Sequence, residues 1–550
     1  MNANKAARGS DPILAIEGLS IEVESDQGWR EIVCGVDLTL RRGEVIGLIG
    51  ESGAGKSTIG LAAMGYTRDG GRISCGTVRF DGKDLVKASD KELRAIRGTR
   101  IAYVAQSAAA AFNPAHRLIN QYSEAPVLKK LRSRADAEGE AKATYKALLL
   151  PDSEHIGFRY PHQVSGGQLQ RAMIAMAMAC RPDIIVFDEP TTALDVTTQV
   201  EVLVAIKLIV ERFNTAALYI THDLAVVAQM ADRIMVLRHG KTVEVGDTRN
   251  ILTEPSQAYT RDLLAVRKKH KAALPREEGQ QRLLSVEGLS ASYGNQKVLH
   301  DVSFDVHPGR TVAIVGESGS GKSTVARVVT GLLASTAGRL FFDGRPLAPA
   351  IGHRSRTDLK RIQLIHQSPD SALNPRQNIG EILGRPLHFF LGLRGAAREQ
   401  RVLELLRMVE LPASFVSRRP TELSGGEKQR ICIARALAAE PELIICDEVT
   451  SALDQLVADG ILQLLQRLQD TLGLSYVFIT HDIETVRAVA DEVIVMQRGR
   501  IVEQGARDVV LSPPHHPYTE LLLSSVPDMD PGWLPALLAR RRITAFNSGS

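Results

Sequence analysis

The chain has few of the features that mark secreted proteins, membrane-spanning proteins or proteins stabilised by a bound metal. Its cysteines, Cys34, Cys75, Cys180, Cys432 and Cys446, are scattered and form no CxxC pair. That argues against a zinc site, an iron–sulfur cluster or a disulfide framework. No apolar run approaches the ~20 residues that span a bilayer, and the start MNANKAARGSDP lacks the apolar core of a secretion signal. We therefore expect a reducing, cytosolic environment.

The chain also has little net charge. Lys and Arg number 67 and Asp and Glu number 63, which leaves a formal net charge of +4 over 550 residues. This balance gives no support to a nucleic-acid-binding surface. Hydrophobic residues make up 44% and charged residues 24%, as in ordinary globular proteins. Because the chain is too long for one core, we expect two or more domains.

The chain contains one unit twice. Four motifs recur in the same order, and they are GESGAGKST (50–58) and GESGSGKST (316–324), VSGGQLQR (164–171) and LSGGEKQR (423–430), IIVFDEPTTALD (184–195) and LIICDEVTSALD (443–454), and YITHD (219–223) and FITHD (478–482). The last three pairs share one spacing. A period this long indicates a duplicated domain, because solenoid repeats are only ~20–50 residues long.

The repeats and the composition between them predict the domain boundaries. We place the first domain at residues 12–264 and the second at 283–528, with a linker at 265–282 and a tail at 529–550. The linker is charged, contains Pro and Gly and has no clear apolar face, so we expect it to be solvated. We expect the tail to be loosely held.

Within each copy, short apolar strands alternate with helical stretches. EVIGLIG and TVAIVG precede the glycine-rich loops, and IGLAAMG and VARVVTGLL follow them. This alternation predicts α/β domains with a largely parallel sheet. Continuous apolar strands predict a sheet that is covered on both faces.

The pattern GxxxxGK[ST] predicts a phosphate-binding loop in each copy. Its glycines allow backbone N–H groups to surround phosphates, and the following helix N-terminus favours negative charge. Lys56 and Lys322 are expected to reach the β- and γ-phosphates, and Ser57 and Ser323 to bind Mg²⁺. A glycine turn without a ligand is the alternative, which two matches in the same context disfavour. The predicted nucleotide-binding residues are Gly50, Glu51, Ser52, Gly53, Ala54, Gly55, Lys56, Ser57 and Thr58, and Gly316, Glu317, Ser318, Gly319, Ser320, Gly321, Lys322, Ser323 and Thr324.

Two adjacent acids end each of the apolar runs IIVF and LIIC. A strand that ends beside the phosphate loop would place Asp188 and Asp447 at the Mg²⁺. Glu189 and Glu448 would then orient and polarise the attacking water. The alternative is an ordinary strand end at a solvated turn, which the upstream phosphate loop disfavours.

Each SGG segment opens a predicted helix. A serine followed by two glycines offers a hydroxyl and exposed N–H groups that suit a second anion contact. A plain helix cap is the alternative. The residues concerned are Ser165, Gly166 and Gly167, and Ser424, Gly425 and Gly426.

The ordered set of motifs resembles the ATP-binding cassette ATPases over nearly the whole chain. The resemblance implies two tandem P-loop domains, each with a helical subdomain. It implies that they pair head-to-tail, so that each ATP lies between one phosphate loop and the other copy's SGG segment. It implies that Gln106 and Gln367 sense Mg²⁺ and the attacking water, and that the catalytic histidines His222 and His481 contact the γ-phosphate. It places the ALD aspartates, Asp195 and Asp454, between the cassettes.

The resemblance also implies an aromatic residue stacked on the adenine. The second copy has Tyr293 in GLSASY, whereas the first has Val23 in GLSIEV and a nearby Trp29 in a loop of different length. We therefore expect weaker adenine binding at the first site. Both glutamates are present, so we expect both sites to hydrolyse ATP.

Further segments resemble the oligopeptide/dipeptide branch of bacterial importers, including its fused, glutathione-type double-cassette members. They are FNPAHRLINQ (112–121), LNPRQNIGEIL (373–383), SPPHHPYTELLLSSVP (512–527) and a fainter TEPSQAYTRDLL (253–264). The resemblance implies an engine on the inner face of the cytoplasmic membrane. Its partners would be two permease subunits and a periplasmic or lipid-anchored binding protein, and its cargo a peptide or similar solute. The HHPY histidines lack a third ligand and make a weak metal site.

Two alternatives remain. A soluble double-cassette ATPase acting in translation usually has a long, charged helical linker, whereas this linker is short and the net charge is low. A fused exporter ATPase is disfavoured by the Asn-Pro and HPYT segments. The cargo is not expected to contact this chain, so the sequence does not identify it.

Overall fold

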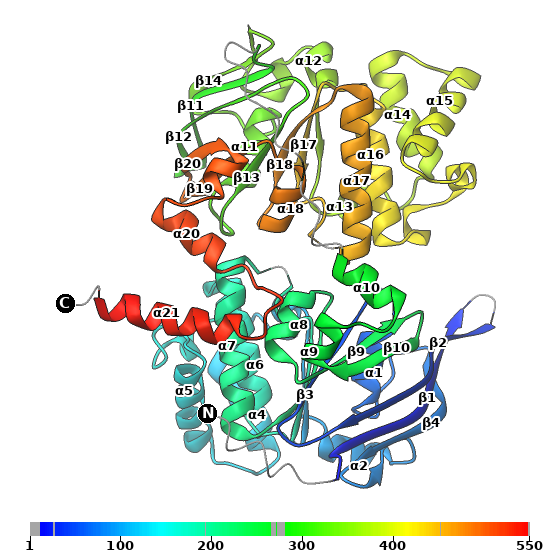
Figure 1. Cartoon of the computed structure of the whole chain (residues 1–550), viewed down its shortest axis with the longest axis vertical. Helices are drawn as coiled ribbons and strands as arrows, with labels where there is room; N and C mark the ends of the chain where they lie inside the picture. Colours follow the sequence, from blue (N-terminus) through cyan, green and yellow to red (C-terminus); the bar gives the residue numbers. More distant parts are fainter. Residues whose placement is uncertain are drawn as a thin grey trace. The chain divides into compact units, whose positions relative to one another are not determined.

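The computed structural model describes residues 11–25, 28–192, 194–265, 271, 281–451 and 453–547, the last seven without side chains. The chain forms two compact units (Figure 1). Unit 1 comprises Met1–Ala265 together with Pro527–Ser550, and unit 2 comprises Val266–Val526. Each unit contains one copy of the duplicated motifs.

Unit 1 is built on two sheets. The first is a six-stranded sheet of order β10-β9-β3-β8-β7-β6, in which β10 pairs antiparallel with β9 and the other neighbours are parallel. Its strands are β3 (Val45–Gly50), β6 (Ile101–Val104), β7 (Ile184–Asp188), β8 (Ala216–Ile220), β9 (Arg233–Arg238) and β10 (Lys241–Asp247). The second sheet is antiparallel, of order β2-β1-β4-β5, and consists of β1 (Leu14–Ser25), β2 (Gly28–Leu40), β4 (Gly71–Phe80) and β5 (Lys83–Asp84).

Apolar cores cover both faces of the parallel sheet. Every residue of β3, β7 and β8 is buried, as expected for strands that lie between two layers. The helices of unit 1 are α1 (Lys56–Ala62), α2 (Asp90–Ile96), α3 (Ala108–Ala111), α4 (Leu118–Leu128), α5 (Arg134–Ala147), α6 (Gly166–Met178), α7 (Val196–Phe213), α8 (Leu224–Met230), α9 (Thr248–Thr253), α10 (Ala258–Ala265) and α21 (Trp533–Asn547). One core joins the sheet to α1 and the antiparallel sheet, and the other joins it to α4–α7.

Unit 2 repeats this plan. Its largely parallel sheet has the order β16-β17-β18-β13-β19-β20, and its antiparallel sheet the order β12-β11-β14-β15. The strands are β11 (Leu284–Tyr293), β12 (Gln296–Val306), β13 (Thr311–Val315), β14 (Ala337–Phe342), β15 (Arg345–Pro346), β16 (Ile362–Ile365), β17 (Leu443–Asp447), β18 (Ser475–Ile479), β19 (Glu492–Gln497) and β20 (Arg500–Ala506). The helices are α11 (Lys322–Val329), α12 (Arg356–Arg361), α13 (Pro369–Ala372), α14 (Ile379–Leu391), α15 (Gly395–Met408), α16 (Gly425–Leu437), α17 (Gln455–Leu472), α18 (Ile483–Val489), α19 (Arg507–Val510) and α20 (Pro517–Ser524).

The predicted α/β fold is therefore confirmed in both copies. The helices α3–α5 and α13–α15 are inserted before β7 and β17 and form the helical subdomains. The sequence analysis did not predict the antiparallel sheets. Their strands are exposed on part of their length, as in β4 with its mixed burial, so they lack the continuous apolar pattern of the parallel strands.

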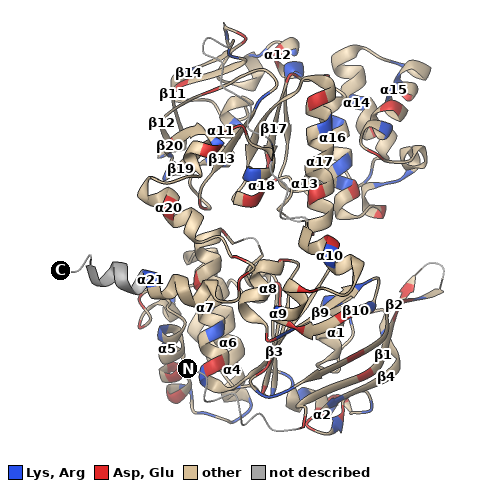
Figure 2. Ribbon diagram, in the orientation of Figure 1, with Lys and Arg blue, Asp and Glu red and all other residues tan. Residues whose placement is uncertain are grey.

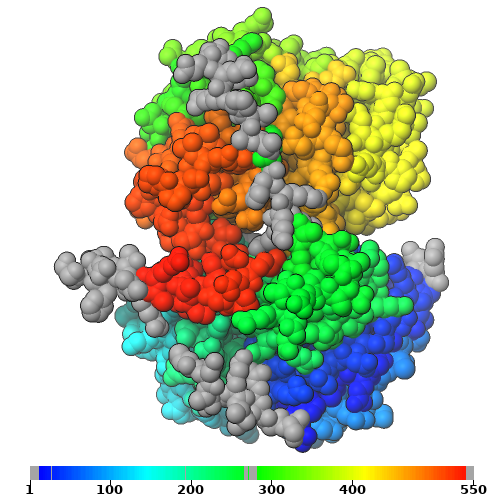
Figure 3. Space-filling model, viewed as in Figure 1, coloured from blue at the N-terminus to red at the C-terminus, as the bar shows by residue number. Residues whose placement is uncertain are grey.

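The C-terminal segment packs in unit 1, although it follows unit 2 in the chain. Leu534 and Leu537 belong to the same core as α6 and α7. Gln229 at the end of α8 donates to the carbonyls of Asp528 and Asp530 at 2.6 and 2.8 Å and accepts from the amide of Leu534. Figure 3 shows this segment, in red, against green residues of unit 1. The expectation of a loosely held tail is wrong here, because apolar side chains on α21 are buried.

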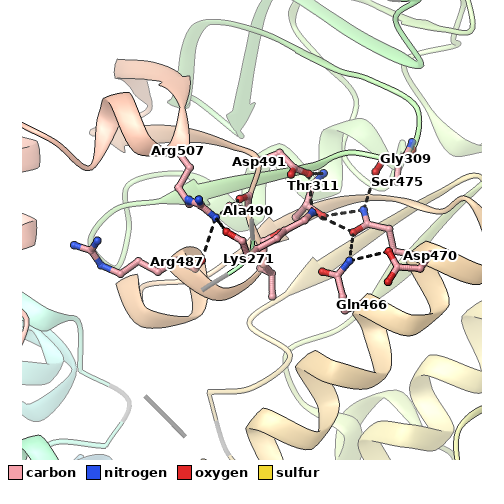
Figure 4. Close-up of polar contacts among 12 residues, drawn as sticks. Lys271, Gly309, Thr311, Gln466, Asp470, Ser475, Arg487, Ala490, Asp491 and Arg507 are labelled. Carbon is pink, nitrogen blue, oxygen red and sulfur yellow. Dashed lines mark hydrogen bonds and ion pairs between the residues drawn. The ribbon is translucent and has the colours of Figure 1, made fainter. Parts of the chain in front are cut away.

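Lys271 is a described residue of the predicted linker, and its side chain is largely covered by unit 2, with 11% exposed. Its Nζ lies 2.8 Å from Asp491 Oδ2 and 3.3 Å from the carbonyl of Val489. Arg507 donates to its carbonyl oxygen. Figure 4 shows the lysine pointing toward Asp491 and Thr311. At this position the expectation of a solvated linker is wrong, because a buried carboxylate takes up the charge.

Charges of both signs are interspersed along the elements of each unit, as α16 and α17 show (Figure 2). In the part of the chain that the structure describes, no helix combines the length and apolarity that crossing a membrane requires.

Candidate nucleotide sites

Each phosphate loop follows a fully buried central strand, β3 or β13. Gly50 has a φ of 148°, and a Cβ there would lie 2.1 Å from the carbonyl oxygen of Leu237, so glycine is required. The ammonium of Lys56 donates to the carbonyls of Gly50 and Glu51 at 2.7 and 2.8 Å. The loop therefore curls around a buried cation. In unit 2, Lys322 does the same with Gly316 and Glu317 at 2.7 Å each.

A serine and an aspartate meet at the start of the helix after each loop. Ser57 Oγ donates to Asp188 Oδ1 at 2.8 Å, and Ser323 Oγ donates to Asp447 Oδ1 at 3.0 Å. A hydroxyl and one carboxylate fit Mg²⁺, which binds few protein oxygens and completes its shell with phosphate and water. The residues present thus fit the expected metal, which would neutralise phosphate charge.

Tyr103 contacts the candidate metal ligand of unit 1, and sequence reasoning missed it. Its hydroxyl donates to Asp188 Oδ2 at 2.5 Å. Burial, and then the hydrogen bond to Asp188, raise the pKa of Tyr103, so the phenol stays protonated. Leu364 occupies the third position of the corresponding strand β16. The sequence signal that could have found it is a tyrosine, with its polar hydroxyl, in the otherwise apolar strand IAYV.

The second acid of each pair lies where three parallel strands end. Glu189 has a left-handed backbone, with φ of 48°, which turns its side chain out of the strand direction. Its Oε2 accepts from Gln106 Nε2 at 3.0 Å, and its Oε1 lies 3.3 Å from His222 Nδ1. The structure brings Glu448, Gln367 and His481 of unit 2 together in the same way. Glu448 has a φ of 50°, and it lies 2.5 Å from Gln367 Nε2 and 3.4 Å from His481 Nδ1.

The glutamate and histidine of each group are close enough to form an ion pair when the histidine is protonated. Burial alone would raise the pKa of Glu189, but the hydrogen bond and charge of His222 outweigh it and lower that pKa. Burial alone would lower the pKa of His222, and the same contact raises it. Glu448 and His481 shift in the same directions for the same reasons. Each glutamate is therefore an anion that can accept a hydrogen bond from water.

The SGG segments cap α6 and α16. Ser165 Oγ accepts from the amide of Gln168 at 3.3 Å, so the plain helix cap is present. A Cβ on Gly167 would lie 2.0 Å from Thr198 in α7, so the second glycine is needed for packing. A Cβ on Gly166 would meet nothing within 4 Å. Packing therefore does not require the first glycine. In unit 2 the matching residues are Ser424, Gly425 and Gly426, the last of which packs on Val457.

The ALD aspartates also cap helices. Asp195 Oδ1 accepts from the amide of Thr198 at 3.0 Å at the start of α7. Asp454 Oδ1 accepts from the amide of Val457 at 3.1 Å at the start of α17. These bonds stabilise the helices that pack against the SGG segments.

The aromatic residues near the two loops are placed differently. Tyr293 ends β11, is 43% exposed, and accepts a hydrogen bond from Arg327 of α11 at 2.9 Å. In unit 1, Val23 lies inside β1, opposite Arg30 and Gly71. Trp29 lies in β2, is 45% exposed, and has the guanidinium of Arg72 4.0 Å from its ring centroid.

Two family models match the chain. The first, described as ABC transporter, matches residues 33–192 and 299–451. The second, described as Oligopeptide/dipeptide transporter, C-terminal region, matches residues 502–547.

Curated relatives match along almost the whole chain. The glutathione import ATP-binding protein GsiA of Salmonella choleraesuis strain SC-B67 is 38% identical over 95% of this chain and 90% of the relative. The protein of the same name in Escherichia coli strain K12 is 37% identical over 94% and 90%. Among solved structures, cbiO1 of Clostridium perfringens, part of the ABC transporter complex cbiONQ, is 29% identical over 42% of this chain and 92% of that chain, with a TM-score of 0.39.

The two family matches agree with the duplicated sites. The ABC transporter model covers both phosphate loops and both Asp-Glu pairs, at residues 33–192 and 299–451, and the oligopeptide/dipeptide model covers residues 502–547. The matches do not support a role in translation. The chain therefore belongs to the ABC transporter family, as a double-cassette ATPase of the oligopeptide importer type.

Proposed function

We propose that this ATPase drives uptake of peptides or of glutathione through two separate permease subunits at the inner face of the cytoplasmic membrane. A periplasmic or lipid-anchored protein would deliver the solute. The observation that carries the proposal is the oligopeptide/dipeptide region at residues 502–547, in a chain 38% identical to a glutathione import ATP-binding protein. The cassettes alone do not select a transport substrate.

Each unit would bind MgATP at its phosphate loop. The loop amides and the lysine would hold the phosphates. Ser57 and Asp188, with Gln106 nearby, would hold the Mg²⁺ in unit 1, and Ser323, Asp447 and Gln367 in unit 2. The contact between each serine and aspartate supports this assignment.

Hydrolysis would depend on the glutamate of each ion pair. Glu189 and Glu448 would accept a hydrogen bond from the attacking water and orient it toward the γ-phosphate. His222 and His481 would keep each glutamate ionised and contact the γ-phosphate. The lowered pKa of both glutamates supports this role.

The two cassettes would pair head-to-tail. Each SGG segment would then bind the γ-phosphate held by the other cassette's loop. The lack of a packing role for Gly166 supports this, because a small residue at a helix N-terminus lets a phosphate approach the backbone.

Copurification tests the importer assignment. The tagged chain would be purified from detergent-solubilised membranes of its native cell, and its partners identified by mass spectrometry. Two integral-membrane permeases would support the proposal, and ribosomal proteins without permeases would contradict it. A complex reconstituted in liposomes would then distinguish glutathione from peptides as the substrate. The binding protein should stimulate ATP hydrolysis when it carries the true substrate and not when it is given the other solute.

A further inference from the structure

A Tyr-Thr pair lies near the end of each cassette and has no role in the site described above. Tyr259 and Thr260 lie in α10, and Tyr518 and Thr519 lie in α20. All four side chains are buried, with exposed fractions between 0% and 7%. The pair in unit 2 lies inside the segment that matches the oligopeptide/dipeptide C-terminal region.

A carboxylate from the neighbouring strand holds the start of each of these helices. In unit 2, Glu503 of β20 accepts from the amide of His516 at 3.1 Å and from the hydroxyl of Thr519. In unit 1, Glu244 of β10 accepts from the amide of Ser256 at 2.8 Å and from that of Gln257 at 3.3 Å. The negative charge suits a helix N-terminus, so both helices are fixed to the sheet edge in the same way.

The tyrosine of unit 2 contacts the phosphate loop. The hydroxyl oxygen of Tyr518 accepts from the amide of Glu317, the second residue of the loop, at 2.9 Å. The carbonyl of the same Glu317 accepts from the ammonium of Lys322 at 2.7 Å. One residue of the loop therefore connects Tyr518 to the lysine that is expected to bind the phosphates.

The tyrosine of unit 1 has the same placement with a weaker contact. The hydroxyl of Tyr259 lies beside Glu51, the second residue of the first loop, but lacks the well-formed hydrogen bond that Tyr518 makes. The guanidinium of Arg238 lies 4.6 Å from the centroid of its ring. Burial, and then the charge of Glu51, raise the pKa of Tyr259, so its phenol remains neutral. The carbonyl of Glu51 accepts from Lys56 at 2.8 Å.

We propose that Tyr518 is a positioning residue for nucleotide binding, which acts through Glu317 to hold the phosphate loop of unit 2 in its binding shape. Tyr259 has the same role in unit 1 with a smaller effect. A loop that is held before binding loses less conformational entropy when the nucleotide arrives. The inference rests on the proposed ATP sites. It assigns a task to the last helices of each cassette, which the proposed ATP chemistry does not use.

The test compares two hydroxyl deletions in the full chain. Tyr518→Phe removes the acceptor for Glu317 and keeps the ring. Tyr476→Phe is the matched control, because the Tyr476 hydroxyl is buried in the same unit and donates to the carbonyl of Leu465, away from the loop. Both are made with Lys56→Ala, so that only the second loop binds. The measurements are equilibrium binding of radiolabelled ATP and thermal unfolding.

We expect Tyr518→Phe to raise the dissociation constant for ATP about three- to tenfold, as loss of one hydrogen bond would, and Tyr476→Phe to leave it unchanged. With Lys322→Ala in place of Lys56→Ala, Tyr259→Phe should have a smaller effect. The inference would be overturned if Tyr518→Phe left the dissociation constant for ATP unchanged and lowered the unfolding temperature only as much as Tyr476→Phe does. If ATP still bound with Lys56→Ala and Lys322→Ala combined, the proposed sites themselves would be wrong.

Discussion

The two cassettes share one arrangement of glutamate, histidine and glutamine and differ in the aromatic residues near it. Both have a glutamate in a left-handed backbone, paired with a histidine and a glutamine at similar distances. They differ in the residues around this centre. Unit 2 has Tyr293 by its loop and a hydrogen bond from the loop to Tyr518. Unit 1 has Trp29 and a tyrosine, Tyr103, on its candidate metal ligand.

If both centres hydrolyse ATP as proposed, duplication has kept one reaction and allowed two binding environments. The reacting groups must converge within hydrogen-bond distance, so few residue types fit. Affinity is a sum of several contacts and can be supplied in different ways. The following predictions test this reading.

The largest effect is expected from the double variant Glu189→Gln with Glu448→Gln. Removing both carboxylates should lower the ATPase rate about 10²- to 10³-fold, the size typical for loss of one key catalytic group. Gln has nearly the same shape, so ATP binding should persist. Steady-state hydrolysis and labelled-ATP binding measure the two quantities.

The single variants sharpen the comparison. Equal losses in Glu189→Gln and Glu448→Gln would show that the different surroundings leave hydrolysis alike. A near-normal rate in the double variant would contradict the assignment of both glutamates.

The next effect is on folding and compares the two docked segments. Lys271→Met should destabilise unit 2 by about 3 kcal/mol, because Asp491 stays buried without its cation. Gln229→Leu should destabilise unit 1 by about 1–3 kcal/mol, because three hydrogen bonds to the C-terminal segment are lost. Calorimetric unfolding of the full chain measures both.

Adding Asp491→Asn to Lys271→Met is the control. It removes the stranded charge while keeping an oxygen for the amide of Thr311, and should restore part of the stability. Unchanged unfolding in both Lys271→Met and Gln229→Leu would show that the segments are not docked as described.

A smaller effect is expected on adenine binding. Tyr293→Ala should weaken ATP binding at the second loop about tenfold, within the ~1–3 kcal/mol that stacking contributes per base. Trp29→Ala should weaken ATP binding at the first loop less, because Arg72 already covers the Trp29 ring. Labelled ATP with Lys56→Ala or Lys322→Ala measures each loop separately. Equal occupancy of both loops in the unaltered chain, with no effect of Tyr293→Ala, would contradict the prediction.

The smallest perturbation is thiol labelling of the native chain. Burial raises the pKa of Cys432 to about 11 and raises that of Cys446 further above its ordinary value, and only thiolates react. Exposed Cys75 of unit 1 should react first at pH 8. Labelling of Cys432 and Cys446 should require unfolding of unit 2 and thereby report it. Rapid labelling of Cys446 in the native chain would contradict its burial.

Much of the fold and site could be predicted because the signals are local. Gly50 to Thr58 is contiguous, and the apolar strand IIVF leads directly into Asp188 and Glu189. The meeting of Gln106, Glu189 and His222 followed from the resemblance, since each ends a different strand. Tyr103 could not be assigned, because its partner Asp188 lies far along the chain.

The sequence by itself determined the duplication, the parallel sheets and the phosphate loops. These depend on periodic burial and on short motifs whose residues are neighbours in the chain. Only the tertiary structure decided that Tyr518 contacts the phosphate loop, that Lys271 pairs with Asp491, and that the segment after unit 2 packs in unit 1. Such contacts join residues distant in the chain. Whether an apolar side chain or a charge is buried depends on the surface that folding brings against it.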